Sequence, residues 1–164
     1  MIRAVLLLVL LAGLGYAQTG EPLNVSLEAY IVTVITKDDG TKEEQFSKAT
    51  TARPGQTVEY RVIVVNTSSE TLPGTNAYIT GPVPASTDYL AESATATSDK
   101  ALLEFSADGG QSFAETPMIT KKNEQGEEVL VEAQPEEYTD ARWQLLQAVA
   151  PQETLTFSYR VTVR

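Results

Sequence analysis

The feature that most constrains the fold of this chain is a repeated alternation of apolar and polar residues with a period of two. It is clearest in residues 154–163, where every second residue is apolar: Leu155, Phe157, Tyr159, Val161 and Val163. Successive side chains of a β-strand point to opposite faces, so this pattern predicts a half-buried strand. Residues 57–65 repeat the pattern, and Ile63 and Val65 make the second face apolar as well. We therefore expect that strand to be covered in part on both sides.

A further strand is predicted at residues 23–35, and its polarity changes along its length. Apolar residues alternate from Leu23 to Ile31, and from Tyr30 onward the opposite face also becomes apolar. A β-bulge or a crossing between sheets near Tyr30 would produce such a change. The polar stretch 121–128 is expected to be an exposed loop. Shorter strands are predicted at residues 43–48, 76–80, 87–92, 101–106, 128–132 and 141–145.

Turn-forming residues separate these segments. They occur as Asp38-Asp39-Gly40, Arg53-Pro54-Gly55, Leu72-Pro73-Gly74, Gly81-Pro82-Val83-Pro84 and Asp108-Gly109-Gly110. Gly adopts positive φ without a steric cost and Pro cannot donate to a strand ladder, so these sites interrupt the strands. Many short strands with turns at this spacing predict an all-β sandwich or barrel. We expect Tyr60, Trp143, Phe157 and Tyr159 to lie in its core, with an exposed binding platform as the alternative for Trp143.

The first residues predict export from the cytoplasm. Arg3 supplies a positive charge, residues 5–14 are an apolar run, and Gly15-Tyr16-Ala17 places small residues where a signal peptidase reads them. The run is shorter than the ~20 residues that span a bilayer. We expect cleavage after Ala17, which leaves a single domain of residues 18–164 in the periplasm, at the cell surface or secreted. A retained N-terminal anchor is the alternative.

The composition excludes several classes of function. The chain has no Cys and no His, so thiolate and imidazole chemistry is absent. It carries 22 acidic and 12 basic residues, which gives a formal net charge of −10 at pH 7. Nucleic acids and anionic membranes require a basic surface, so both are poor partners. We expect no enzymatic activity and no cofactor, because no paired nucleophile and base or other catalytic motif is present.

Residues 53–95 resemble the conserved-repeat domain of bacterial and archaeal surface proteins, also called domain of unknown function eleven. Its members have Pro-Gly, a strand that contains tyrosine, an Asn-Thr turn, another strand and a Pro-rich step. The matching features are Pro54-Gly55, residues 58–65 with Tyr60, Asn66-Thr67, residues 76–80 and Pro82-Val83-Pro84. Trp143 and residues 151–163 look like the closing strands of the family. The resemblance covers roughly residues 27–164, and its middle part matches loosely.

This resemblance implies an immunoglobulin-like antiparallel β-sandwich of about seven to nine strands, in a cell-surface or envelope context and without catalytic residues. Such domains often occur in tandem, whereas this chain has a single copy behind its predicted signal peptide. Two positions depart from the family. Gly81 stands where an Asp usually precedes the Pro-rich step, and Gln152 stands where a Gly usually follows Pro151. The missing Asp weakens any transfer of a cation-binding role.

A second motif lies in residues 106–113, which fit the Asp-box spacing S-x-D-x-G-x-[ST]-[FW]. Its residues are Ser106, Asp108, Gly110, Ser112 and Phe113. In this motif the Asp side chain caps the N–H groups of a turn and the aromatic ring packs beneath the hairpin, so we interpret it as structural. A loop that contacts a sugar or a cation is the alternative. One copy does not predict a propeller, which needs repeated blades.

Adjacent acidic residues occur as Asp38-Asp39, Glu43-Glu44, Glu127-Glu128 and Glu136-Glu137. Neighbours in a strand face opposite sides, so adjacency does not supply the two facing carboxyls of a glycosidase. Asp38-Asp39-Gly40-Thr41 also lacks the alternating ligands of a calcium loop. We therefore predict a solvated surface and no metal site. Tyr30 and Tyr78 are the candidates for an exposed aromatic patch.

Together these features predict a non-catalytic module of the cell envelope or cell surface that is structural or engages other proteins. Its partners would be envelope proteins, wall polymer or further copies of itself. Self-association would occur by adding a strand, such as residues 23–35, to a neighbouring sheet edge. The alternative is a carbohydrate- or calcium-binding β-sandwich, which would show converging carboxylates or an exposed aromatic row.

Overall fold

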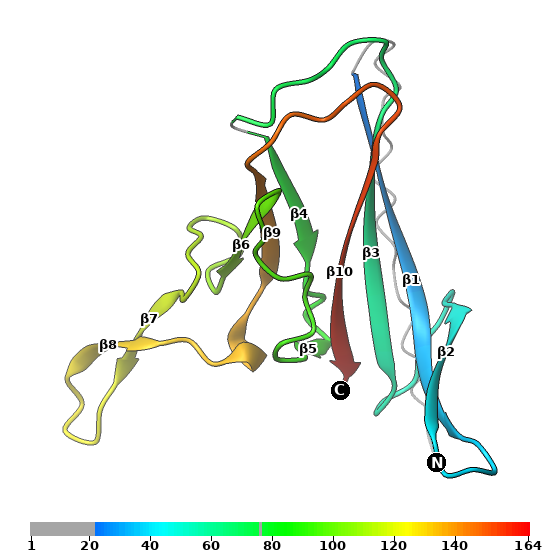
Figure 1. Cartoon of the computed structure of the whole chain (residues 1–164). Coiled ribbons are helices and arrows are strands. Elements are labelled where there is room, and N and C mark those ends of the chain that lie inside the picture. The colour runs from blue at the N-terminus through cyan, green and yellow to red at the C-terminus, as the bar shows by residue number, and fades with distance from the viewer. Residues whose placement is uncertain (1–21, 76) are drawn as a thin grey trace.

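The computed structural model describes residues 22–75 and 77–164, which form an antiparallel all-β structure (Figure 1). The predicted signal peptide, residues 1–17, lies outside the described residues. The elements are β1 (Leu23–Thr36), β2 (Lys42–Lys48), β3 (Thr57–Asn66), β4 (Tyr78–Pro82), β5 (Thr87–Tyr89), β6 (Ala101–Ser106), β7 (Met118–Lys122), β8 (Glu128–Glu132), the 3₁₀ turn η1 (Pro135–Glu137), β9 (Asp140–Leu145) and β10 (Thr154–Val163). The prediction of an all-β antiparallel sandwich is confirmed, with ten strands in the described chain where about seven to nine are expected.

Two sheets form the sandwich, and a third sheet is a separate hairpin. The larger sheet has the strand order β2-β1-β3-β10-β5 and the smaller has the order β4-β9-β6. All neighbouring strands are antiparallel. The hairpin of β7 and β8 projects away from the sandwich (Figure 1). Because β3 is the central strand of the larger sheet, the first and last strands of the described chain pair on either side of it.

The core fills the space between the inner faces of the two sheets. Trp143 on β9 has no solvent exposure, and its ring stacks on Phe157 of β10 at a centroid distance of 5.1 Å. Tyr60 on β3 stacks on Tyr159 of β10 at 5.3 Å. Tyr60, Trp143, Phe157 and Tyr159 therefore lie together in the core. The exposed alternative for Trp143 is wrong, because its indole N–H donates to the carbonyl of Thr95 inside the protein.

The strand β1 has neither a bulge nor a crossing between sheets near Tyr30, so that prediction is wrong. Its pairing with β3 runs without interruption from Leu23 opposite Asn66 to Val32 opposite Thr57. Its pairing with β2 begins where Tyr30 lies opposite Lys48. The second face of β1 becomes apolar because Tyr30 and Val32 lie beside the exposed ring of Phe46 on the outer face of the sheet.

The hairpin of β7 and β8 replaces the loop predicted at residues 121–128. Lys121 belongs to β7, and β8 begins at Glu128. The turn between them is held by Asn123, whose side-chain carbonyl accepts hydrogen bonds from the N–H groups of Gln125 and Glu127. β8 matches the strand predicted at residues 128–132, whereas β7 was not predicted, because its exposed and half-buried residues show no regular apolar alternation.

The strand β5 ends at Tyr89 and is shorter than the predicted segment 87–92. The chain leaves the sheet because Glu92 has a φ of +59°, in the left-handed region that interrupts an extended strand. Leu90 still donates its N–H to the carbonyl of Arg160 on β10. The loop after β5 therefore stays close to the edge of the larger sheet.

Gly81 occupies a position where the two sheets are in closest contact. A Cβ atom at this residue would lie 2.5 Å from the ring of Tyr159, far inside the van der Waals distance. The hydroxyl of Tyr159 donates to the carbonyl of Pro82, which fixes the ring against this backbone. The structure thus gives a steric reason for Gly at the position where the resembling family usually has Asp.

We predict that Gly81→Ala lowers the free energy of unfolding by about 2 kcal/mol, because the added methyl group overpacks the core against Tyr159. Urea unfolding followed by circular dichroism measures this change. Thr80→Ala, at the exposed neighbouring position of β4, is the matched control and should shift stability by less than ~0.5 kcal/mol. An unchanged unfolding midpoint for Gly81→Ala would show that this contact is looser than described.

Candidate interaction site

The N-terminal half of β1 has a neighbour on one side alone. Residues 23–28 pair with β3, whereas β2 begins its pairing at Tyr30. The carbonyl of Ala29 accepts from the N–H of Ala49, so odd-numbered residues of β1 direct their backbone groups away from β3. The N–H and C=O groups of Leu23, Val25 and Leu27 consequently face this edge. No strand within residues 22–75 and 77–164 pairs with it.

The side chains beside this open edge are apolar and partly exposed. Val25 is 54% exposed and Leu27 is 37% exposed, although they lie opposite the buried residues Val64 and Val62. Residues opposite one another in an antiparallel pair share a face, so both side chains belong to the inner face of the larger sheet. The smaller sheet faces β10 and β3, and β1 lies farther from it (Figure 1). The open edge therefore continues into an uncovered apolar strip.

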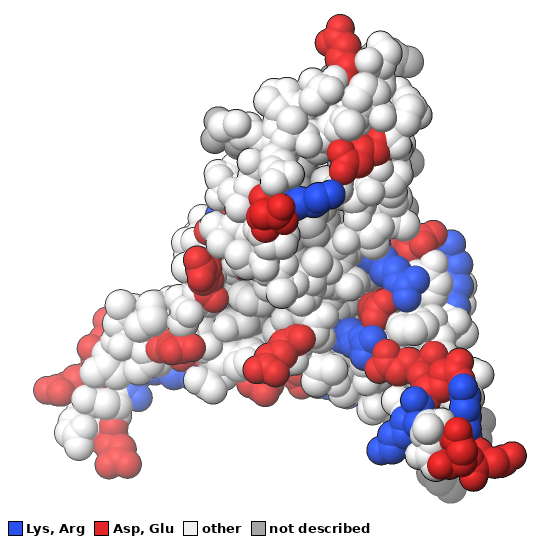
Figure 2. All heavy atoms as spheres, in the orientation of Figure 1, with Lys and Arg blue, Asp and Glu red and all other residues white. Residues whose placement is uncertain are grey.

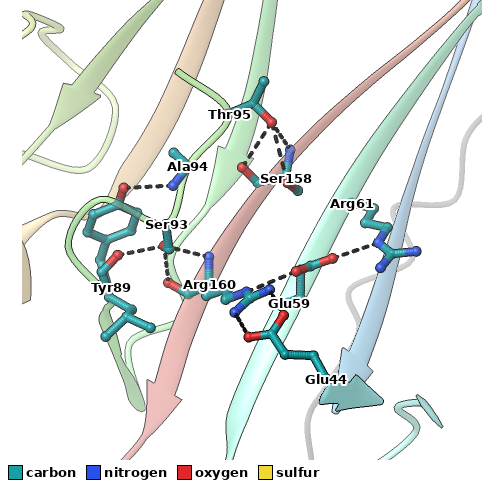
Figure 3. Close-up of polar contacts among 10 residues, drawn as sticks. Glu44, Glu59, Arg61, Tyr89, Ser93, Ala94, Thr95, Ser158 and Arg160 are labelled. Carbon is teal, nitrogen blue, oxygen red and sulfur yellow. Dashed lines mark hydrogen bonds and ion pairs between the residues drawn. The ribbon is translucent and has the colours of Figure 1, made fainter. Parts of the chain in front are cut away.

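The opposite side of the larger sheet is closed above β5. Ser93 and Thr95 follow the short β5 and take the place of a longer strand along β10 (Figure 3). The hydroxyl of Ser93 accepts the N–H of Arg160 at 2.9 Å, and the hydroxyl of Thr95 accepts the N–H of Ser158 at 2.8 Å. The N–H of Thr95 donates to the carbonyl of Ser158 at 2.7 Å. These contacts remove backbone groups that a partner strand would need.

The outer strand β2 is protected in a different way. All its residues are exposed, and among them are Lys42, Glu43, Glu44 and Lys48. Charged side chains on an edge strand oppose the addition of a further strand. Figure 2 shows blue and red spheres interleaved over the end of the sheet where β2 lies. By contrast, residues 22–27 carry no charged side chain, so this half of β1 lacks that protection.

An ionic network on the outer face ties three strands of the larger sheet together (Figure 3). Arg160 on β10 donates two hydrogen bonds of 2.7 Å to the carboxylate of Glu44 on β2 and one of 2.9 Å to Glu59 on β3. Glu59 also accepts from Arg61 at 2.7 Å, and its side chain is 9% exposed. The contacts with Glu44, and then those with Glu59, raise the pKa of Arg160 above its usual value.

Arg61 continues this network into a stack of aromatic rings. Its guanidinium lies 4.4 Å from the ring centre of Tyr30 on β1 and 4.8 Å from that of Phe46 on β2. Cation–π contacts of this kind hold a side chain flat against its neighbours. The hydroxyl of Tyr30 in turn donates to Glu28 at 2.7 Å, which lowers the pKa of that carboxyl. The network therefore ends at Glu28, the last residue of the half of β1 that pairs with β3 alone.

A second stacked arginine lies on the outer face of the smaller sheet. The guanidinium of Arg142 is 4.6 Å from the ring centre of Tyr78 and 3.8 Å from that of Phe113, and it donates to Glu104 at 2.7 Å. Tyr30 and Tyr78, the two candidates for a surface aromatic patch, are thus on opposite outer faces of the sandwich. Each covers an arginine, and they do not form one patch.

The predicted Asp-box residues form a closed turn. Asp108 accepts hydrogen bonds from the hydroxyls of Ser106 and Ser112, and from the N–H groups of Gln111 and Ser112. Gly110 has a φ of +80° and donates its N–H to Ser106. The ring of Phe113 supports Arg142, as described above. Because both carboxylate oxygens of Asp108 accept bonds from the turn itself, the geometry favours the structural interpretation over a sugar or cation contact.

The adjacent acidic pairs lie at separate places in the fold. Asp38-Asp39 is in the turn before β2, Glu43-Glu44 is on β2, Glu127-Glu128 is at the tip of the hairpin, and Glu136-Glu137 is in η1. Within residues 22–75 and 77–164, no group of three or more acidic, His or Cys side chains converges to hold a metal ion. The same part of the chain contains no helix that is long and apolar enough to cross a membrane.

Comparison with known proteins identifies no relative of this chain. No protein-family model, no curated protein and no solved structure matches the chain. The candidate site therefore rests on its own geometry, which is an uncharged open edge next to an uncovered apolar strip.

Sequence reasoning placed a strand at the open edge but missed the network beside it. The signal was present, since Glu59 and Arg160 are charged residues inside the two most apolar strands. They lie directly opposite each other in the pairing of β3 with β10. Oppositely charged residues at facing positions of neighbouring strands indicate a cross-strand ion pair. The register that brings them together was not known from the sequence.

We predict that Glu59→Gln lowers the free energy of unfolding by about 2 kcal/mol, because two arginines lose a charged hydrogen-bond partner that is largely shielded from water. Chemical denaturation at low and high salt measures the effect. Glu43→Gln removes an exposed partner of Lys37 and should cost less than ~0.5 kcal/mol. Equal effects of the two substitutions would show that the network does not hold the strands together.

We predict that carbon-detected NMR titration will show a pKa of about 2 for Asp108, because the hydroxyl of Ser112 and the turn N–H groups stabilise its charged form. This lowered pKa stabilises the fold above the unfolded-state value of ~3.9, and the contribution disappears as the pH falls through the folded-state pKa. Ser112→Ala should raise the pKa of Asp108, and Ser98→Ala should leave it unchanged. An Asp108 that titrates near 3.8 in the wild type would contradict the described turn.

Proposed function

We propose that this chain is a non-catalytic, exported module of the cell envelope that assembles by adding the open edge of β1 to the same edge of a second copy. The observation that carries the proposal is the row of outward backbone groups on Leu23, Val25 and Leu27. The larger sheet would thereby continue across two molecules. Strand addition of this kind gives affinity through main-chain hydrogen bonds and specificity through alternate side chains.

The open edge is complementary to itself. If two copies meet antiparallel about a two-fold axis at Val25, Leu23 of each faces Leu27 of the other. These residues are the ones whose N–H and C=O groups point outward, so each facing pair can exchange both backbone hydrogen bonds. On the other face, Asn24 would lie opposite Ser26. A closed two-fold contact of this type uses the same surface on both subunits.

Charge also favours a second copy at this position. The net charge of −10 disfavours association of copies through most of the surface, because like charges repel. Residues 22–27 carry no charge, so that repulsion is weakest here. Glu28 already pairs with Lys48 at 3.1 Å, and in the proposed register it would lie opposite Pro22 and not another Glu. The register thus avoids contact between like charges.

The location in the envelope is supported by two sequence features. Residues 1–17 have the composition of a signal peptide, and residues 53–95 resemble a domain of bacterial surface proteins. In that setting, envelope proteins with an exposed strand and wall polymer are further partners of the same module. The calcium-binding form of the alternative function needs converging carboxylates, and no group of three or more lies among the described residues. The carbohydrate-binding form needs an exposed aromatic row, and Tyr30 and Tyr78 lie on opposite outer faces.

A proline substitution tests the edge without breaking the sheet. Val25→Pro removes an N–H that points away from β3, and proline is tolerated on an edge strand, so the fold should persist. We predict that residues 18–164 dimerise with rising concentration in analytical ultracentrifugation, and that Val25→Pro raises the dimer dissociation constant at least ~10-fold.

Two controls keep this result interpretable. Val25→Thr retains the backbone N–H and should still dimerise. Ser26→Pro removes an N–H directed toward Ile63 of β3, so it should lower the thermal midpoint where Val25→Pro does not. A wild-type chain that stays monomeric at about 1 mM, a concentration that would reveal even a millimolar affinity, overturns the proposal. Dimers that form equally well with Val25→Pro would do the same.

A further inference from the structure

An open cleft of about 490 Å³ lies at one end of the sandwich, away from the edge of β1. Its walls come from β5, β6, the loop after β5 and the segment around η1. This volume falls in the range of small-molecule sites, about 300–1,000 Å³. The cleft is independent of the proposed assembly, because none of its lining residues belongs to β1 or β2.

Three aromatic rings line this cleft and pack against one another. Phe105 on β6 stacks on Tyr138 at a centroid distance of 4.5 Å, and Tyr89 on β5 meets Phe105 edge-on at 5.1 Å. Tyr89 is buried, whereas Phe105 and Tyr138 are half-buried. Aromatic faces carry partial negative charge, so a group of three rings can attract a cation that is weakly hydrated.

The loop that forms one wall is held in place before any ligand arrives. Ser93 and Thr95 bind β10 through their hydroxyls, and the N–H of Ala94 donates to the hydroxyl of Tyr89 (Figure 3). Glu92 in the same loop has a φ of +59°, a conformation that residues other than Gly seldom adopt. Such strain persists where surrounding contacts enforce it, and it is frequent at binding sites.

The charge of the lining is of one sign. Glu92 is the one ionisable acid among the residues that line the cleft, and no Lys or Arg lines it. Burial raises the pKa of both Tyr89 and Tyr138, and the nearby carboxylate of Glu132 raises that of Tyr138 further. Both phenols therefore stay neutral at pH 7. The lining offers few hydrogen-bond groups for a sugar, but it combines aromatic faces with a carboxylate.

We propose that this cleft binds a small quaternary ammonium compound, with its cationic head on the free face of the stack formed by Phe105 and Tyr138 and its charge balanced by Glu92. Quaternary ammonium groups have no N–H to satisfy, which suits a lining with few acceptors. A cation over an aromatic face is attracted by the partial negative charge of that face. An anion is disfavoured by Glu92, and a purely apolar ligand would leave that carboxylate without a counter-charge.

Isothermal titration of residues 18–164 with choline tests this proposal, and 3,3-dimethylbutan-1-ol serves as the neutral compound of the same shape. We expect choline to bind at least about fivefold more tightly than the neutral compound, because the cation–π and carboxylate contacts require charge. Equal affinity for the two compounds overturns the proposal. Absence of saturation at about 50 mM choline overturns it as well.

Matched variants assign the contacts. Glu92→Gln should weaken choline binding about fivefold and leave the neutral compound unaffected, and Glu70→Gln, at an exposed site outside the cleft, should change neither. Glu92→Gly removes the carboxylate and relieves the positive φ, so it should weaken binding while keeping or raising the thermal midpoint. Glu92 variants that bind choline like the wild type overturn the assignment. Tighter binding of N-acetyl-lysine methylamide than of choline would overturn the choice of a quaternary group.

Discussion

The contact between Trp143 and the aromatic residues of β10 determines how the two sheets meet. Trp143 is fully buried, stacks on Phe157, and lies 6.2 Å from Tyr159, whose ring fills the space left by Gly81. Both polar atoms of this cluster have partners, since the indole N–H donates to Thr95 and the phenol donates to Pro82. Large rings that are fixed by hydrogen bonds permit one arrangement of the sheets and exclude sliding. This cluster sets the smaller sheet over β10 and β3, and the remaining features of the molecule follow from that placement.

The first consequence is that one part of the larger sheet has no cover. The three strands of the smaller sheet cannot cover all five strands of the larger one, and because the aromatic cluster is centred on β10, the uncovered part includes β2 and residues 25–27 of β1. Natural β-sheet proteins usually protect such an edge with charged side chains, a bulge or a covering segment. Here β2 is charged and the edge of β10 is occupied by Ser93 and Thr95, while residues 22–27 have neither form of protection. An exposed apolar residue alone is common on protein surfaces and indicates no binding site. The open edge indicates one because the other edges of the same sheet are protected and this edge is not.

Strands with one buried and one polar face were predictable from the sequence, as β10 shows, since burial on one side leaves a period of two. In the outlying hairpin, β8 was predicted at residues 128–132, whereas β7 was missed because its exposed and half-buried residues leave no regular apolar pattern. The apolar second face of β1 was interpreted as a bulge or a crossing between sheets, although it reflects packing against Phe46 across the sheet. The core position of Tyr60 followed from the alternation in its strand, and that of Trp143 from analogy with the cores of other β-sandwiches. The network of Glu44, Glu59 and Arg160 depends on the register of strands far apart in the sequence, and local pattern does not contain the register.

The loop after β5 connects the closed edge to the cleft. If β5 continued past Tyr89 as a regular strand, it would close the edge of β10 with backbone hydrogen bonds, and its side chains would alternate across the sheet. Instead the chain turns at Glu92, and the hydroxyls of Ser93 and Thr95 replace the missing strand bonds. The loop stays bonded to β10 and, together with Phe105 and Tyr138, lines the cleft. One local departure from β-geometry therefore has two effects: it prevents strand addition at this side, and it forms the cleft. The two sides of the larger sheet consequently differ in what they can bind, since one presents backbone groups and the other presents aromatic faces with a carboxylate.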